Sequence, residues 1–138
     1  MNMTTESQPR VPLRVVTKAS AQPFDITLQR LEDELRKRGL TLVAKVDHAA
    51  AAEQVGLVMP PTVVLIFGNP RVGTPLMLET PLLALDLPLK LLVLEDAAGQ
   101  TWVSCDAPGY LADRYGIPAT RATGISGVSA LVAAALDH

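Results

Sequence analysis

The feature that most constrains the fold is an apolar run over residues 62–67, followed at once by a segment of turn-forming residues. Five successive apolar residues, three of them β-branched, occupy positions 63–67, and this composition favours a central β-strand covered on both faces. Residues 68–74 then bring two glycines, an asparagine and a proline, which favour turns. The sequence therefore predicts an interior strand that leaves its sheet through a glycine-containing loop.

Periodicity predicts further elements on both sides of this strand. Additional strands are expected at residues 13–17, 42–46, 89–95 and 100–105. The last two of these form a hairpin around a turn at 96–99. Helices are expected from Phe24 to Gly39, at 48–55 with Asp47 as its cap, from Thr74 onward, at 108–115 and at 125–136.

This order of elements is not the regular strand–helix alternation of a doubly wound parallel sheet, and the hairpin requires at least one antiparallel pair. The fold class predicted is α+β, with a single mixed or mainly antiparallel sheet of about five strands and helices packed on one side. The other face then needs cover from the C-terminal helix or from a second subunit. We expect a flexible tail at residues 1–10 and one domain over 11–138.

Composition excludes several classes of partner. With 12 basic and 14 acidic residues, a net charge of −2 and 4% aromatic residues, the chain lacks the basic and stacking surface of a nucleic-acid binder. Prolines, Asp86 and Lys90 interrupt the apolar runs well short of a membrane span of about 20 residues. A lone cysteine, Cys105, and a polar N-terminus predict a cytoplasmic protein. The apolar share of 49% indicates self-association; the form expected is a homodimer, in line with the family resemblance given below.

The first candidate site is the loop over residues 68–74. Gly68 and Gly73 permit close backbone approach, and Asn69 belongs to the same turn. Arg71 supplies a positive fork, while Thr74 caps a helix that has Pro75 at its first position. Together these residues favour a small anionic ligand such as a carboxylate or phosphate. The alternative is purely structural, with a standard turn followed by a capping threonine.

His48 is the second candidate, because it stands beside Asp47 at a helix start, where an imidazole can act as ligand, base or pH-sensing group. The alternative is a histidine that forms only local hydrogen bonds. His48, Met77 and Cys105 have no metal-ligand spacing, so no metal site is expected. Cys105 is expected to be a small core or edge residue. The sequence shows no assembled catalytic set and no cofactor motif, so we expect no cofactor.

Several motifs spaced along the chain resemble one family. They are the run over residues 67–77, Leu85-Asp86-Leu87-Pro88, Glu95-Asp96 before a glycine turn, Trp102-Val103, Arg114-Tyr115-Gly116 and, upstream, Phe24-Asp25 and Asp47-His48-Ala49. This pattern resembles the bacterial and archaeal domain of unknown function family 302 (DUF302). The resemblance implies a small α+β fold similar in general class to that of the TATA-binding protein, often dimeric and with no established activity. Fold likeness does not carry nucleic-acid binding with it.

These observations leave three functional hypotheses. The favoured one is a dimeric binding module that holds a small metabolite or anion at the loop over residues 68–74. The alternatives are a hydrolase-like enzyme that uses His48 as a base, and a purely structural dimerisation subunit.

Overall fold

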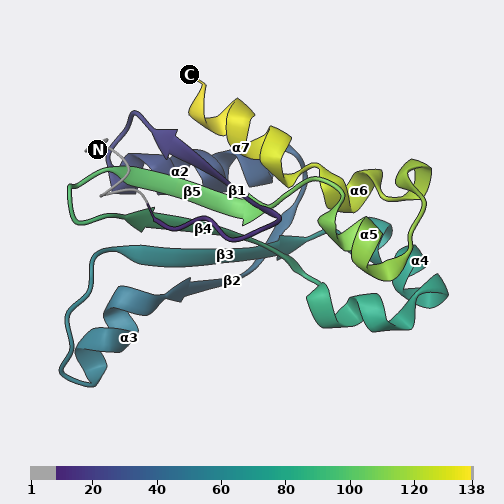
Figure 1. Ribbon diagram of the computed structural model, residues 1–138, viewed down its shortest axis with the longest axis horizontal. Helices are drawn as coiled ribbons and strands as arrows, with labels where there is room; N and C mark the ends of the chain where they lie inside the picture. The colour runs from purple at the N-terminus through teal and green to yellow at the C-terminus, as the bar shows by residue number, and fades with distance from the viewer. Residues whose placement is uncertain (1–8, 138) are drawn as a thin grey trace.

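A five-stranded antiparallel sheet forms the centre of the computed structural model, which describes residues 9–137 (Figure 1). The strand order is β1-β5-β4-β3-β2, and every neighbouring pair is antiparallel. The strands are β1 (Val15–Ser20), β2 (Thr41–Asp47), β3 (Thr62–Gly68), β4 (Leu89–Glu95) and β5 (Thr101–Asp106). The α+β prediction is confirmed. The predicted tail lies outside the described residues except for positions 9 and 10, which belong to no helix or strand.

The β3 strand shows how the apolar run is used. It lies between β2 and β4, so the predicted interior strand is present. Val63, Leu65 and Phe67 are buried, whereas Val64 and Ile66 alternate with them and are only half-buried. Because alternate residues of a strand point to opposite faces, one face of the sheet is covered within the chain and the other is not. The expectation that β3 is covered on both faces is therefore wrong for the isolated chain.

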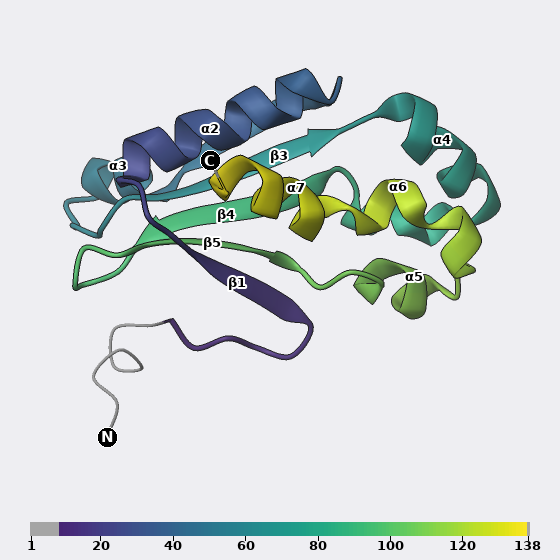
Figure 2. The ribbon, with the colours of Figure 1, turned by 90° about the horizontal axis from the view of Figure 1, so that it is seen from above.

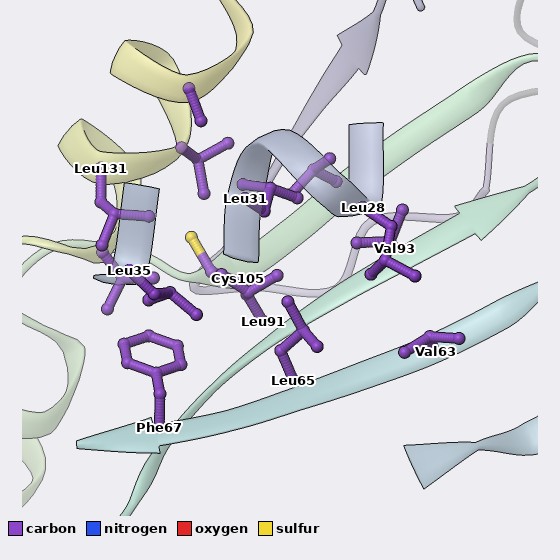
Figure 3. Packing of buried hydrophobic residues seen from close by; sticks show 14 of the residues in the cluster. Leu28, Leu31, Leu35, Val63, Leu65, Phe67, Leu91, Val93, Cys105 and Leu131 are labelled. Carbon is purple, nitrogen blue, oxygen red and sulfur yellow. The ribbon is translucent and has the colours of Figure 1, made fainter. Parts of the chain in front are cut away.

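Two helices, α2 (Phe24–Lys37) and α7 (Val128–Leu136), lie side by side over the covered face (Figure 2). Leu28, Leu31 and Leu35 form the buried stripe of α2, as their helical spacing predicts. They pack with the inward-facing residues of β3, β4 and β5 and with Leu131 of α7 (Figure 3). Because the C-terminal helix packs beside α2, it does not cover the second face.

Five of the other helices form a separate layer at one end of the sheet, which we call the helical cap (Figures 1 and 2). It consists of α4 (Pro70–Glu79), η1 (Pro81–Asp86), α5 (Tyr110–Tyr115), η2 (Ala119–Arg121) and α6 (Thr123–Ser126). The cap has its own small core, which includes Leu76, Leu83, Leu111 and Ile125. The helix predicted over 125–136 is divided at Gly127 into α6 and α7, because Ile125 belongs to the cap core and Leu131 to the sheet core.

The turn between β4 and β5 is held by Asp96. Its Oδ1 accepts the backbone N–H groups of Ala98 and Gln100, each at 2.9 Å. Its Oδ2 accepts the indole N–H of Trp102 at 2.8 Å. The bond from Trp102, assisted by the backbone N–H bonds, lowers the pKa of Asp96 below its ordinary value of 3.8. The predicted hairpin is confirmed, and Asp96 is one of its structural residues.

The segment over residues 41–61 consists of β2, α3 (His48–Gln54) and the following loop, and we call it the edge arm. None of its residues is buried, and α3 projects away from the rest of the chain (Figure 1). Asp47 caps α3 as predicted, with its Oδ1 accepting the N–H of Ala50 at 2.9 Å. An ion pair of 3.3 Å between Lys45 and Glu32 ties the arm to α2. The exposed large apolar side chains of the arm are Leu42, Val43, Val46, Val55, Leu57, Val58 and Met59.

Candidate functional site

The helix α4 begins earlier than the sequence predicts, at Pro70 instead of after Thr74. Asn69 is the cap: its side-chain oxygen accepts the N–H of Arg71 at 3.0 Å. The N–H groups of Val72 and Gly73 bond to the carbonyl of Asn69, each at 2.9 Å. These amides are therefore satisfied within the helix start, and the predicted role of Thr74 as a cap is wrong.

The physical reason is that the same cap-then-proline signal occurs twice in succession. Asn69-Pro70 precedes Thr74-Pro75, and asparagine is at least as good a cap as threonine. The helix begins at the first signal, which leaves Pro75 inside the helix. The predicted loop over residues 68–74 is consequently the end of β3, one capping residue and the first turn of α4.

A pocket of about 310 Å³ opens beside this segment, where the helical cap meets the ends of β2, β3 and β4. We call it the apolar pocket. Its lining is dominated by aliphatic and thioether side chains, with a few polar groups from Thr41, Asn69 and Thr74. The main apolar residues of the lining are Leu40, Val43, Val72, Met77, Leu87, Leu89 and Ile125.

The structure brings together four of the five predicted loop residues. Gly68, Asn69, Gly73 and Thr74 all line the apolar pocket. Arg71 is exposed and is not part of the lining. Neither glycine has a left-handed backbone, and a Cβ added at Gly73 would lie 3.5 Å from the Cδ1 atom of Leu87, an ordinary contact. The glycines are therefore not required for the backbone conformation.

The sequence reasoning missed the other walls of the pocket. Thr41 and Val43 come from β2, and Leu87 and Leu89 come from the segment that leads into β4. The sequence offered one signal, the strand predicted over 42–46, but not its partner: Thr41 pairs with Gly68. That register places Thr41 directly beside the first residue of the predicted loop over residues 68–74.

His48 lies elsewhere. It is the first residue of α3 on the edge arm, is exposed, and does not line the apolar pocket. The Asp47 carboxylate beside it is used in capping Ala50. Among the described residues, no group of three His, Cys, Asp or Glu side chains is placed to hold a metal ion.

Cys105 is a core residue, as predicted. It is buried among the residues that pack under α2 and α7. Burial, together with the negative charge of Asp106, raises the pKa of its thiol to about 11. The thiolate is the reactive form of cysteine, so this residue is not an activated nucleophile at neutral pH.

Comparison with known proteins identifies the family of this chain and a structural relative of its fold. The model of the family described as domain of unknown function DUF302 matches residues 16–137. The chain belongs to the DUF302 family. The crystal structure of an uncharacterized conserved DUF302 protein from Bacillus stearothermophilus superposes with a TM-score of 0.75 at 24% sequence identity. The superposition covers 91% of this chain and 98% of that one, which shows that the DUF302 fold is shared.

Two curated Brucella proteins are similar over part of their length. Both are named fluoride-specific ion channel FluC 1, one from Brucella suis biovar 1 (strain 1330) and one from Brucella abortus biovar 1 (strain 9-941). Each is 37% identical over 103 residues, which is 75% of this DUF302 chain. The match spans only 41% and 38% of the two Brucella chains. Within residues 9–137, no helix is long and apolar enough to cross a membrane.

Proposed function

We propose that this DUF302 chain is a dimeric binding module whose apolar pocket holds a small carboxylic acid with an apolar body. The observation that carries the proposal is the pocket itself, with a volume of about 310 Å³ and a mainly aliphatic lining. Ligand pockets in proteins start at about this size and combine an apolar wall with a few polar groups that orient the ligand. The pocket includes Gly68, Asn69, Gly73 and Thr74.

The lining favours a ligand whose body is apolar. Val43 comes from β2, Met77 from α4 and Leu87 from the segment between η1 and β4, and all three line the same space. A methionine adapts its shape to irregular ligands because its side chain is unbranched and flexible. Each methylene group that leaves water for such a lining contributes about 0.8 kcal/mol, so the ligand gains affinity mainly through its hydrocarbon part.

Arg71 makes the site prefer a ligand with a carboxylate group. Its neighbours Pro70 and Val72 both line the pocket, whereas Arg71 is exposed and makes no ion pair with any described residue. A guanidinium binds a carboxylate through two parallel hydrogen bonds. The ligand's carboxylate would bind Arg71 at the rim while the apolar body enters the pocket. This arrangement retains an anionic ligand although the α4 amides are already used.

The test is a titration of ¹⁵N-labelled protein with straight-chain carboxylates of increasing length and with alcohols of matched length. We expect amide shifts at Gly68, Gly73 and Ile125, and an affinity that rises about fourfold per methylene until the pocket is full. Sodium fluoride serves as a further probe because of the names of the Brucella relatives. An affinity independent of chain length would refute an apolar pocket as the binding site.

Two variants and a control separate the parts of the proposal. Arg71→Ala should weaken the carboxylates and leave the alcohols unchanged. Gly73→Ala adds a methyl group that contacts Leu87 and Met77 without a clash, so it should weaken the longest ligands most. Arg36→Ala is the control, because it removes the same charge from an exposed position on α2.

The proposed dimer forms through the uncovered apolar surface of the chain. On the open face of the sheet, Val64 pairs with Leu92 and Leu94 pairs with Trp102, and all four are half-buried. The edge arm adds the exposed side chains defined above. We favour a second copy of this chain as the partner, because identical antiparallel edge strands such as β2 can use the same surface in both subunits. A free apolar edge left uncovered would favour aggregation.

Sedimentation velocity tests this association without reference to any ligand. Leu57→Lys places a charge on the edge arm, where Leu57 is 64% exposed, and we expect it to convert a dimer into monomers. Leu85→Lys is the matched control on η1, where Leu85 is 79% exposed. A wild-type protein that sediments as a monomer would refute the dimer, and dissociation by Leu85→Lys alone would place the interface on the cap.

A further inference from the structure

A second pocket, with a volume of about 180 Å³, lies at the end of β5 where the chain enters the helical cap. We call it the polar pocket, and it is different from the apolar pocket, although Leu89 and Ile125 line both. Its charged lining residues are Asp86, Lys90 and Asp106, and Tyr110 and Ser126 complete its polar wall. The lining therefore contains both signs of charge around one small space.

Lys90 and Asp106 are placed at the same level of the sheet. Leu92 of β4 pairs with Ser104 of β5, and Lys90 lies two residues before Leu92 as Asp106 lies two after Ser104. The two residues therefore lie just beyond the last residues paired between these two neighbouring strands, and by the alternation of strand residues both belong to the face of Leu92 and Ser104. They make no ion pair with each other within 4.0 Å, nor with any other described residue. The opposite charges beside the pocket remain available to a ligand.

Asp86 is the fixed acid of the pocket. Arg114 donates to its Oδ2 at 2.8 Å, and the hydroxyl of Tyr115 donates to the same oxygen. No described residue donates to Oδ1. The carboxylate is thus held in one orientation by two donors while one of its oxygens remains able to accept a further hydrogen bond. A held carboxylate loses little side-chain freedom when a ligand binds.

The Tyr110 wall is also held in place. The guanidinium carbon of Arg14 lies 5.6 Å from the centroid of the Tyr110 ring, and Arg14 donates to Asp113 at 2.6 Å. These contacts join Arg14, the residue before β1, to α5. Asp86 and Tyr110 are therefore held in position by residues outside the pocket.

We propose that the polar pocket binds a small zwitterion, a compound with one ammonium and one carboxylate group. The ammonium would donate to Asp86 and Asp106, and the carboxylate would accept from Lys90. Arg114 already pairs with Asp86, so Lys90 and Asp106 present one charge of each sign to a ligand, which favours a zwitterion over phosphate or a simple anion. At about 30 Å³ per water molecule, the volume of the pocket corresponds to roughly six waters. If each heavy atom of a ligand replaces about one water, the pocket fits an amino acid of about five to seven heavy atoms.

The test is an NMR titration of ¹⁵N-labelled protein with β-alanine, with propionate and propylamine as probes that carry one charged end each. We expect β-alanine to shift the amides of Asp86, Lys90 and the segments 106–111 and 126–128, none of which lines the apolar pocket. It should bind about tenfold more tightly than either probe, because each probe lacks the charge-assisted contacts of one end. Shifts of these same amides by propionate with a Kd as low as that of β-alanine would overturn the proposal. So would the absence of shifts in these segments at about 10 mM, ten times a weak Kd of about 1 mM.

The variants test the two charged ends separately. Lys90→Gln should weaken β-alanine about tenfold, whereas Lys37→Gln, at an exposed position on α2, should not change it. If Lys90→Gln loses its dispersed spectrum, Asp106→Asn carries the same test for the ammonium end. Unchanged affinity in a folded Lys90→Gln or Asp106→Asn variant overturns the assignment, whatever the result for carboxylates at the apolar pocket.

Discussion

The contact between α4 and α6 gives the sharpest test of the helical cap. A Cβ added at Gly124 would lie 2.0 Å from the Cγ1 atom of Val72 and 3.3 Å from its Cβ. Carbon atoms in contact prefer a separation of about 3.5 Å or more, so Gly124→Ala requires the two helices to separate by on the order of 1.5 Å or Val72 to change rotamer. A valine in a helix strongly prefers one rotamer, so the second route is also unfavourable.

We expect Gly124→Ala to change the free energy of unfolding in the direction opposite to that expected from helix propensity alone. Alanine in a helix is favoured over glycine by up to about 1 kcal/mol, and Gly124 has no left-handed backbone that would oppose the change. Propensity therefore predicts that Gly124→Ala stabilises the protein. Overpacking costs about 1–3 kcal/mol, and the four-residue helix α6 gains little from propensity. We expect the free energy of unfolding to fall by about 1–2 kcal/mol.

Urea denaturation measures this change, with Trp102 as the only tryptophan of the chain and circular dichroism as a second signal for the cap. Val72→Ala removes the clashing methyl groups, so the double variant Gly124→Ala with Val72→Ala should be more stable than the sum of the two single effects predicts. A positive coupling of about 1 kcal/mol would confirm a direct contact. A Gly124→Ala variant as stable as the wild type would refute the close packing of α4 on α6.

Three further predictions concern single residues. Leu83→Ala should lower the free energy of unfolding by about 2–5 kcal/mol in urea denaturation, because Leu83 is 0% exposed in the cap core, whereas Leu82→Ala, at 77% exposure, should change it little. Cys105 should react with Ellman's reagent at pH 8 only as fast as the protein unfolds, because its pKa is raised to about 11; rapid reaction would contradict its burial. The folded-state pKa of Asp96 is lowered, so its stabilisation is present above the ordinary value of 3.8 and is lost as the pH falls from there through the folded pKa. The thermal unfolding temperature of Asp96→Asn should therefore depend less on pH below about 4 than that of the wild type.

The elements that the sequence predicts well are those with local signals. The α2 stripe of Leu28, Leu31 and Leu35 follows from helical spacing, and Asp47 caps α3 where a capping residue precedes an alanine-rich run. The hairpin turn at 96–99 follows from its glycine. In each case the neighbours that decide the conformation lie within a few residues along the chain.

The boundaries of elements were less predictable where strand pairing sets them or where two local signals compete. The strand β1 runs from Val15 to Ser20 instead of over 13–17, because its extent is set by pairing with β5. Likewise, the start of α4 was assigned to Thr74, although Asn69 offers the same signal earlier. Local patterns do not decide between helix starts after Asn69 and after Thr74, because both residues satisfy the same capping chemistry. Tertiary packing decides between such alternatives.

The candidate site could be predicted only in the part that is contiguous in sequence. Residues 68–74 were singled out for backbone amides that in fact bond within α4, yet four of the residues named there line a pocket. The pocket's chemistry comes from Val43, Met77 and Ile125, which are brought together by β2 pairing with β3 and by α6 packing against α4. No periodicity within one element encodes such a meeting point. Because its walls belong to both the sheet and the cap, a change in the position of the cap relative to the sheet would change the volume of the pocket.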